Sequence, residues 1–271
     1  MIFRGGFSQH TAANGVVLTV CDALAALGSV THAFTTRIGG VSEGAFASMN
    51  LTVSTGDRAE NVRANLERLL AALPNTPQTV CLTHQVHKDR ILRVTAENAG
   101  DFSAAPPECD GLVTAERGHL LLGKFADCVP ILLADRRSGA CAVVHAGWRG
   151  TVADIAAKGA RALCACADTA PADLIAAIGP SIGPCCFLTH DDVADPVRAL
   201  CGASAADHIA PAADGRWHID LKGINAARLE AFGVGEIHVC TECTCCLPER
   251  YYSHRRTGLA RGSLAAVIQR N

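Results

Sequence analysis

Three side chains of the kind that bind a soft metal ion lie beside apolar segments of the sequence. Cys128 lies between two apolar runs, Gly118 to Phe125 and Val129 to Ala134, and His145 follows a third. His87 lies in a polar loop between two predicted strands. Side chains at strand ends project into shared clefts, so residues far apart in the sequence can converge there. Two nitrogens and one sulfur suit zinc, and three protein ligands leave a fourth position for water or substrate, as in catalytic zinc sites.

The same residues also permit chemistry without a metal. A Cys128 thiolate could act as a nucleophile with His145 as its base, as in cysteine hydrolases, and Asp127 would then orient a neighbouring group. A thiolate that binds zinc is a poor free nucleophile, so the two interpretations exclude each other. The chain has eleven histidines and fourteen cysteines, so spacing alone leaves both open.

Two glycine-containing turns have the composition of an anion site. In the segment 145–151, HAGWRGT, glycines permit a tight backbone, and Arg149 stands at the start of a predicted helix, where N–H groups and the helix dipole favour an anion. The segment 35–42, TTRIGGVS, combines hydroxyls, Arg37 and glycines in a similar way. Each turn also fits a packing turn with an exposed arginine.

The composition is that of a globular chain with a sizeable core, at 49% hydrophobic and 18% charged residues. The formal net charge of -2 argues against a nucleic-acid partner, which usually selects a basic surface. The first residues, MIFRGGFSQH, lack the pattern of a signal peptide. The most apolar stretch, Leu120 to Ala134, is too short and too polar to span a bilayer. We therefore expect a cytoplasmic protein without nucleic-acid or membrane partners, as a monomer or weak homo-oligomer.

The cysteines do not indicate a disulfide framework, because the chain is long and shows no signal peptide. Most of them fit the role of small buried apolar residues. A cluster near the C-terminus differs, since Cys240-x-x-Cys243 has the spacing of zinc ligands and Cys245 and Cys246 follow. No CxxC pair elsewhere in the chain accompanies this cluster, so we favour reduced structural thiols there over a structural zinc ion.

Apolar periodicity predicts helices over 60–73, 152–166, 192–201 and 219–231. In the first, Val62, Leu66, Leu69 and Leu70 fall on one face, and Asp57 is a candidate cap. Asp220 stands near the start of the last. Predicted strands are mixed among them without strict alternation, which indicates a mixed sheet in an α/β fold. They cover 16–21, 30–36, 79–83, 90–95, 118–125, 129–134, 140–144, 174–178, 237–240 and 265–268.

Taken together, the ordered motifs of the chain resemble the YfiH family, described as laccase-domain or polyphenol-oxidase-like proteins and as purine nucleoside phosphorylases. The most specific pair is FADCVPILLAD (125–135) followed by VVHAGWRGT (143–151). The other matching segments are TTRIGGVSEG (35–44), MNL (49–51), GDRAENVRAN (56–65), HQVH (84–87), CDGLVT (109–114), AAIGPSIGPCC (176–186), Asp220-Leu221 with Asn225, Cys243-Thr244 and YYSHRR (251–256).

The resemblance implies that His87, Cys128 and His145 are zinc ligands. It also implies a layered α-β-β-α arrangement with mixed sheets, in which residues 1–271 form a single catalytic domain with its site in a cleft.

The resemblance further implies phosphorolysis of adenosine, inosine, guanosine and methylthioadenosine, and deamination of adenosine. Zinc can lower the pKa of a bound water molecule, which suits deamination. Phosphorolysis needs a phosphate cradle, for which Arg37 and Arg149 are candidates. Asp127 is a candidate acid or base, or a group that orients a metal ligand, beside the catalytic candidates Cys128 and His145. Further substrate contacts are expected at Asn50, Ser253, His254 and Arg255.

Three positions depart from the family pattern. Lys88 follows HQVH where the family usually has glycine, and the segment 187–190 reads FLTH in place of a Tyr-Glu-Val-Gly run. A C-terminal TGR-like motif is blurred into 259–262, LARG.

Three other functions compete with the nucleoside enzyme. A copper-dependent polyphenol oxidase needs about ten histidines, often as HxH pairs, and this chain has no such pair, although copper could bind adventitiously at the zinc site. A hydrolase that edits peptidoglycan (muramyl–amino acid) precursors could use zinc or the Cys128–His145 pair. A non-enzymatic metal-binding protein would fill all four coordination positions with protein ligands.

Overall fold

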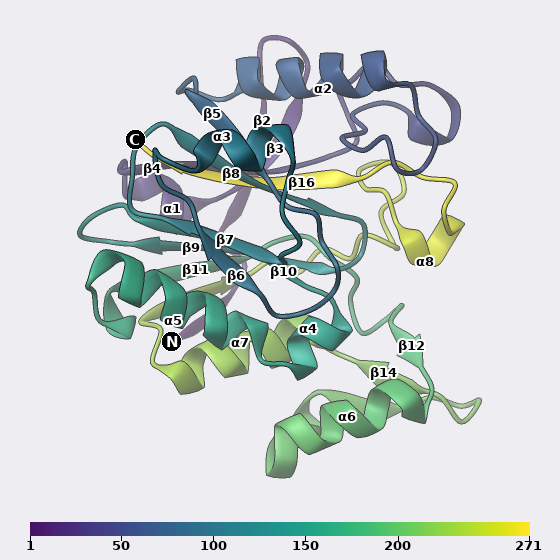
Figure 1. The fold of residues 1–271 in the computed structure, drawn as a ribbon. Helices are drawn as coiled ribbons and strands as arrows, with labels where there is room; N and C mark the ends of the chain where they lie inside the picture. Colours follow the sequence, from purple (N-terminus) through teal and green to yellow (C-terminus); the bar gives the residue numbers. More distant parts are fainter.

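Two mixed β-sheets lie face to face in the computed structural model, which describes residues 1–271, and helices cover their outer faces (Figure 1). Helix α2 (Ala59–Ala72) lies on one sheet, and α5 (Ile155–Ala167) and α7 (Leu221–Phe232) lie on the other. The expected α/β fold with its layered α-β-β-α arrangement is therefore confirmed. No helix is long and apolar enough to cross a membrane.

Each sheet takes strands from distant parts of the chain. The first has the order β1 (Ile2–Arg4), β15 (Glu236–Val239), β11 (Leu174–Ile178), β9 (Val129–Asp135), β10 (Cys141–Ala146), β7 (Gly111–Thr114) and β6 (Ile91–Arg93). The second has the order β2 (Phe7–Thr11), β3 (Val17–Cys21), β4 (Val30–Thr35), β16 (Leu264–Arg270), β8 (His119–Phe125) and β5 (Thr79–Leu82). Parallel and antiparallel pairs occur in both, as predicted.

The central strands are apolar throughout because both of their faces are covered. In β8, Leu120 and Leu122 pack in one apolar cluster with Leu69 of α2, and Leu121 packs in another with Leu132 of the opposite sheet. This alternation along the strand separates the core into layers. The ten predicted strands are found, with ends within two residues of those expected.

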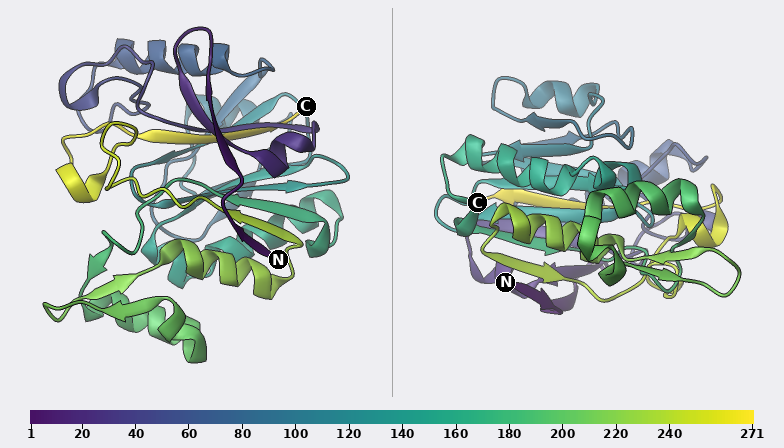
Figure 2. Two further views of the ribbon diagram at one scale, coloured as in Figure 1. Left: turned by 180° about the vertical axis from the view of Figure 1, so that it is seen from behind. Right: turned by 90° about the horizontal axis from the view of Figure 1, so that it is seen from below.

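A smaller unit projects to one side of the layered body (Figure 2). It joins α6 (Asp191–Cys201) to a three-stranded sheet with the order β12 (Leu188–Thr189), β14 (Trp217–Ile219) and β13 (Ile209–Pro211). The remaining α-helices are short: α1 (Asp22–Ala26), α3 (Ala99–Ala104), α4 (Trp148–Val152) and α8 (His254–Thr257).

Two local predictions need correction. The helix expected over 152–166 is found as α5, but it begins at Ile155, because Asp154 adopts a left-handed backbone (φ 62°) and its carboxylate pairs with Arg228 of α7 at 2.7 Å. Asp57 does not cap α2, whose N-cap residue is Arg58. By contrast Asp220 does cap α7, since its carboxylate accepts a hydrogen bond from the N–H of Gly223.

A buried histidine in β4 makes the stability of the fold depend on pH. Nε2 of His32 accepts a hydrogen bond from the N–H of Cys21 at 2.9 Å, so the ring is neutral, and burial lowers its pKa to about 4. The unfolded chain binds this proton near pH 6.5, so the stabilisation is complete above that pH and is lost as the pH falls towards 4.

We predict that the wild type loses about 3 kcal/mol more unfolding free energy than His32→Gln between pH 6.5 and 4. Glutamine keeps an acceptor for the Cys21 N–H but cannot be protonated. Urea unfolding at a series of pH values measures this difference, and parallel curves for the two proteins would contradict it.

Candidate metal centre

The three predicted metal ligands converge at the place where the chain crosses from one sheet to the other. Cys128 lies in the crossing between β8 and β9, His145 lies near the end of β10, and His87 lies in the loop between β5 and β6. Their ligand atoms all lie within 4.8 Å of one another. The rings of His87 and His145 are nearly perpendicular, with centroids 4.9 Å apart. His145 is buried, whereas His87 is exposed at the rim.

The buried carboxylate of Asp110 holds two of these ligands in place. It lies 2.8 Å from Nδ1 of His145, which leaves Nε2 of that ring to face a metal. It also accepts hydrogen bonds from the backbone N–H groups of Val86, His87 and Lys88, at 3.3, 3.0 and 2.9 Å. A carboxylate behind a ligating histidine fixes the tautomer and the ring orientation. The sequence motif contained Asp110, but no role was predicted for it.

The backbone conformation of the turn that carries His87 explains why Lys88 can stand where related sequences usually have glycine. His87 itself adopts the left-handed conformation (φ 58°), and Lys88 is not among the residues with positive φ. Three N–H groups bound to one carboxylate stabilise this turn, so glycine is not required at position 88.

The charges of the cluster favour the thiolate of Cys128. Burial alone would raise the pKa of this thiol, but His145 and His87 outweigh it and lower the pKa to about 6. Burial would lower the pKa of His145, but the negative Cys128 and the hydrogen bond to Asp110 raise it to about 9. The pKa of Asp110 lies below its usual value, because hydrogen bonds from His145 and the loop outweigh its burial. A deprotonated thiol is the form that binds a metal.

The donor set and the space around it fit a single zinc ion. Two imidazole nitrogens and one thiolate are preferred zinc ligands. A Cβ atom at Gly147 would lie 3.1 Å from Cδ2 of His87 and 3.3 Å from Sγ of Cys128, so a larger residue would crowd these two side chains. The chain's own side chains supply three ligands and no fourth, so an ion held by them would keep one coordination position for water or substrate.

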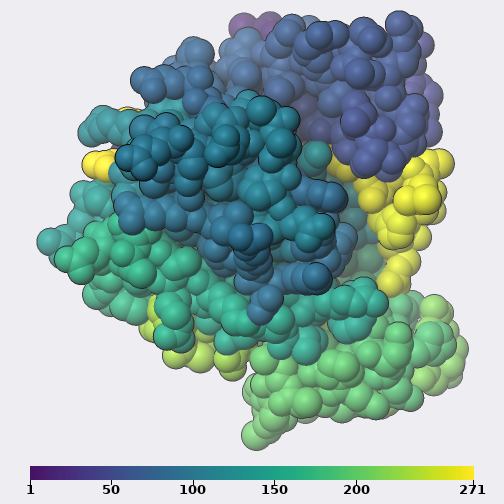
Figure 3. Space-filling model, in the orientation of Figure 1, coloured from purple at the N-terminus to yellow at the C-terminus, as the bar shows by residue number.

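His87, Cys128 and His145 line a cavity of about 480 Å³, a volume within the range of small-molecule sites. In Figure 3 the recess lies between the blue segments and the yellow C-terminal segment. Most of the residues that line it are polar, and Thr52, Ser54, Thr83 and Ser263 contribute hydroxyls. Lys124 and Arg261 add two cationic side chains that the sequence interpretation missed. Arg261 lies in the blurred 259–262 motif, which was the signal available for it.

Arg37 and Asn50 do not line this cavity. The guanidinium of Arg37 donates to the carbonyls of Ala47 and Pro248 and lies over the ring of Tyr252. Asn50 is fully buried, and its Oδ1 accepts hydrogen bonds from the N–H groups of Thr52 and Ser263. Asn50 therefore positions two residues that do line the cavity.

Asp127 faces away from the cavity, although it precedes Cys128. Its carboxylate accepts hydrogen bonds from Oγ1 of Thr244, Oγ of Ser253 and the N–H of Arg255, and its backbone has φ 90°. With three donors on its two oxygens, Asp127 fastens the C-terminal segment to the turn that carries Cys128.

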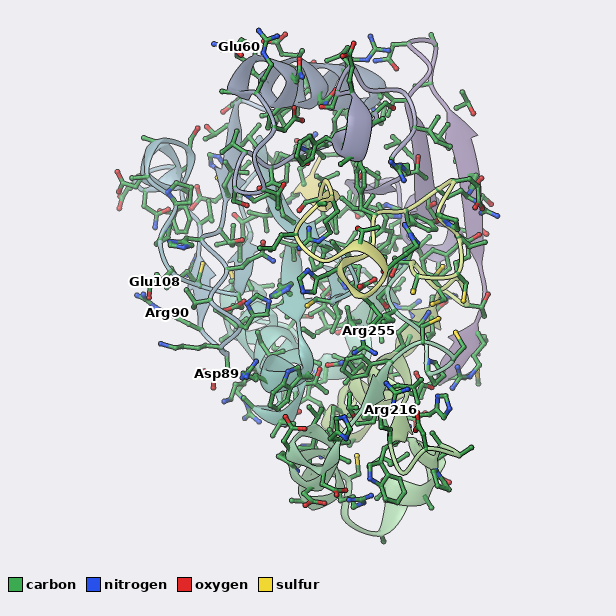
Figure 4. The ribbon with its side chains drawn as sticks, turned by 90° about the vertical axis from the view of Figure 1, so that its right-hand side faces the viewer. Glu60, Asp89, Arg90, Glu108, Arg216 and Arg255 are labelled. Carbon is green, nitrogen blue, oxygen red and sulfur yellow. The ribbon has the colours of Figure 1, made fainter.

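Three predicted substrate contacts also lie outside the cavity. Arg255 is a residue of α8, and its side chain (labelled in Figure 4) donates to the carbonyls of Cys186 and Leu188. His254 is exposed, with Nδ1 near the carbonyl of Gly258. Arg149 is exposed and stacks on Trp148, at 4.2 Å from the ring centroid.

We predict that Asp110→Asn weakens metal binding by about 10–100-fold. Asparagine has a similar size, but it removes the negative partner of His145 and one acceptor of the loop N–H groups. Competition with a chelator measures the affinity. Asp89→Asn is the matched control, because Asp89 lies at the surface of the same loop (Figure 4) and pairs with Lys158. Equal affinity in the two variants would show that Asp110 does not support the metal site.

Comparison with known proteins identifies relatives of similar sequence and fold. Purine nucleoside phosphorylase YlmD of Geobacillus stearothermophilus is 38% identical over 242 residues, which cover 87% of this chain and 88% of that protein. Its crystal structure superposes with a TM-score of 0.89 over 98% of this chain and 99% of that one, at 35% identity. The crystal structure of YfiH of Bacillus licheniformis gives 0.88 over 97% and 99%, at 31% identity.

A further relative, named adenosine deaminase RL5, from an unknown prokaryotic organism, is 33% identical over 247 residues, which cover 88% of this chain and 94% of that protein. Residues 31–271 match the family model described as multi-copper polyphenol oxidoreductase laccase. The chain therefore belongs to this laccase-domain family, as its resemblance to YfiH indicated.

Proposed function

We propose that this protein is a zinc-dependent purine nucleoside phosphorylase, acting on adenosine, inosine, guanosine and methylthioadenosine, that also deaminates adenosine. The observation that carries the proposal is a cluster of two histidines and one cysteine. It opens into a cavity lined mostly by polar residues, two of which have cationic side chains. Relatives named purine nucleoside phosphorylase and adenosine deaminase support it. We expect the enzyme to work in the cytoplasm as a monomer or weak homo-oligomer.

In phosphorolysis a phosphate oxygen bonds to the anomeric carbon of the ribose, the glycosidic bond breaks, and the purine leaves with a proton. The protein must hold an anion next to a sugar that becomes positively charged. Zinc held by His87, Cys128 and His145 would act as a Lewis acid and lower the pKa of bound water. The remaining work, which is binding, orientation and exclusion of water, falls to the side chains of the cavity.

Lys124 and Arg261 are the best candidates to hold the phosphate. Burial lowers the pKa of Lys124, and no acidic neighbour opposes this effect. A bound anion would therefore stabilise the charged form of its ammonium group. Arg261 donates through one terminal nitrogen to the carbonyl of Gly262 and to Oγ of Ser263, and its buried Nε has no partner. We therefore assign phosphate to these residues rather than to Arg37 and Arg149.

The cavity hydroxyls are suited to the ribose and the base. Thr52 and Ser263 are fixed by Asn50, and Gln85 is fixed by hydrogen bonds in both directions with the backbone of Lys124. Asn50 and Asp127 act as positioning residues in this proposal. Ser253 and Arg255 support the turn of Cys128 through Asp127, and His254 lies at the exposed end of α8, outside the cavity.

A metal-free cysteine hydrolase is the second candidate, and one observation favours it. Asp110, His145 and Cys128 form a chain of hydrogen-bonded groups like that of an activated nucleophile. A hydrolase of peptidoglycan precursors could use this arrangement or the metal. A multicopper oxidase is disfavoured, because such enzymes need several copper sites and only one histidine-containing cluster is present.

We predict that the purified wild type, incubated with adenosine and phosphate, contains zinc at this site and forms adenine and inosine. Cys128→Ala and His145→Ala should each lower both rates by roughly 100-fold or more. Chromatography of the products and metal analysis provide the readouts, and Cys164→Ala in α5 is the control.

Zinc without nucleoside turnover would shift the assignment to the precursor hydrolase. A metal-free protein with a reactive Cys128 would contradict the zinc proposal and support the cysteine-hydrolase interpretation.

We predict that Lys124→Met raises the KM for phosphate by roughly 10–100-fold, the effect of losing one charge-assisted hydrogen bond. Deamination of adenosine uses no phosphate, so its rate should change much less. Lys158→Met, on the surface of α5, is the matched control. If Arg149→Met raised the KM for phosphate and Lys124→Met did not, the assignment based on the sequence motif would stand instead.

A further inference from the structure

A second group of metal-binding side chains lies outside the cavity. The sulfur atoms of Cys185, Cys186, Cys243 and Cys246 all lie within 4.8 Å of one another. Sγ of Cys246 is 3.6 Å from that of Cys185 and 3.4 Å from that of Cys186. The first two cysteines precede β12, and the other two follow β15, so two loops some sixty residues apart in sequence meet here.

These separations are those of four thiolates around one ion. With Zn–S bonds of about 2.3 Å, a tetrahedral site places its sulfur atoms about 3.8 Å apart. A disulfide would require about 2.05 Å, and no cysteine of the chain is in a disulfide. Four sulfurs this close together leave no space for an iron–sulfur cluster.

The backbone around the cluster orients its sulfur atoms. Sγ of Cys243 accepts a hydrogen bond from the N–H of Gly183 at 3.2 Å, and the N–H of Cys246 donates to the carbonyl of Cys243, which closes the turn between these two cysteines. A Cβ atom at Gly183 would lie 3.2 Å from Sγ of Cys185 and 3.7 Å from Sγ of Cys243. Hydrogen bonds that orient ligands are typical of metal sites.

A buried positive charge lies beside the cluster. Lys222 is 4% exposed, and its ammonium donates to the carbonyls of Cys240 and Glu242 without a carboxylate partner. The groups whose negative charge acts on it are, in order of strength, Cys240, Asp220, Cys243 and Cys185. Because a buried charge needs a partner, an anionic metal–thiolate cluster would compensate it.

We propose that Cys185, Cys186, Cys243 and Cys246 bind a second zinc ion whose coordination is completed by protein. Such closed four-cysteine sites stabilise structure. The pair with ligand spacing is Cys243-x-x-Cys246 rather than Cys240-x-x-Cys243, and its partner pair is Cys185-Cys186.

The proposed ion would stabilise the two loops that hold the turn carrying Cys128, a ligand of the first metal centre. Thr244, between two of its ligands, donates to the carboxylate of Asp127, and Arg256 donates to the carbonyls of Thr244 and Cys245. Arg255 donates to the carbonyl of Cys186. Both loops of the cluster therefore hold the turn that carries Cys128.

Metal analysis of the reduced, purified protein tests this proposal independently of the nucleoside activity. We expect two zinc ions per chain in the wild type and one in Cys128→Ala, whose cavity site is disrupted. Replacement of zinc by cobalt in Cys128→Ala should give the strong thiolate-to-cobalt charge-transfer bands of a four-thiolate site. In the Cys128→Ala background, the added substitutions Cys185→Ser and Cys246→Ser should remove this ion and these bands. The control substitutions Cys164→Ser and Cys166→Ser, made in the same background, should keep both.

A reduced Cys128→Ala protein without bound metal would overturn the proposal, as would a native disulfide among the four cysteines. If the double serine variant does not fold, alkylation of folded Cys128→Ala decides the question. Zinc should protect the four cysteines until a chelator removes it, and equal alkylation with and without the chelator would contradict the site.

Discussion

Four hydrogen-bond donors converge on the buried carboxylate of Asp110, and the geometry of the metal centre depends on them. One donor is the ring of His145 on β10, and three are N–H groups of the loop that carries His87. A single side chain thus sets the tautomer of one ligand and the backbone of another. Because this carboxylate is 1% exposed, its negative charge is compensated only by these donors and by the positive character of His145. The ligands and their support therefore form one unit in which each charge stabilises the next.

The layered fold supplies the rigid frame for this unit. The crossing between β8 and β9 passes from one sheet to the other, so Cys128 lies at an edge where both sheets contribute residues. Cavity residues come from the segments around 52, 85, 124, 145 and 261, which only the folded chain brings together. The C-terminal segment reaches the same place and is fastened by Asp127 from behind.

The sequence predicted most strands and drew attention to the three candidate ligands for two physical reasons, although only the family resemblance selected the metal interpretation. Strands buried on both faces appear as uninterrupted apolar runs, and the ligands stand where such runs end. It did not predict β1, β2 or the small sheet, whose strands are short or half exposed. It also missed Lys124 and Arg261, because the direction of a side chain at a sheet crossing depends on tertiary packing. The arginines that it favoured are held by backbone carbonyls or stacked on aromatic rings, which a motif does not reveal.

Strand β16 is the last of the strands to be synthesised, yet it lies between β4 and β8 in the interior of its sheet. A ribosome-bound chain that lacks it would hold two half-sheets with unpaired inner edges, which are prone to associate with other chains. Closing the sheet also brings Arg261 and Ser263 to the cavity, since both directly precede β16. Pairing of β16 with β4 and β8 therefore closes the second sheet and completes the cavity in the same step.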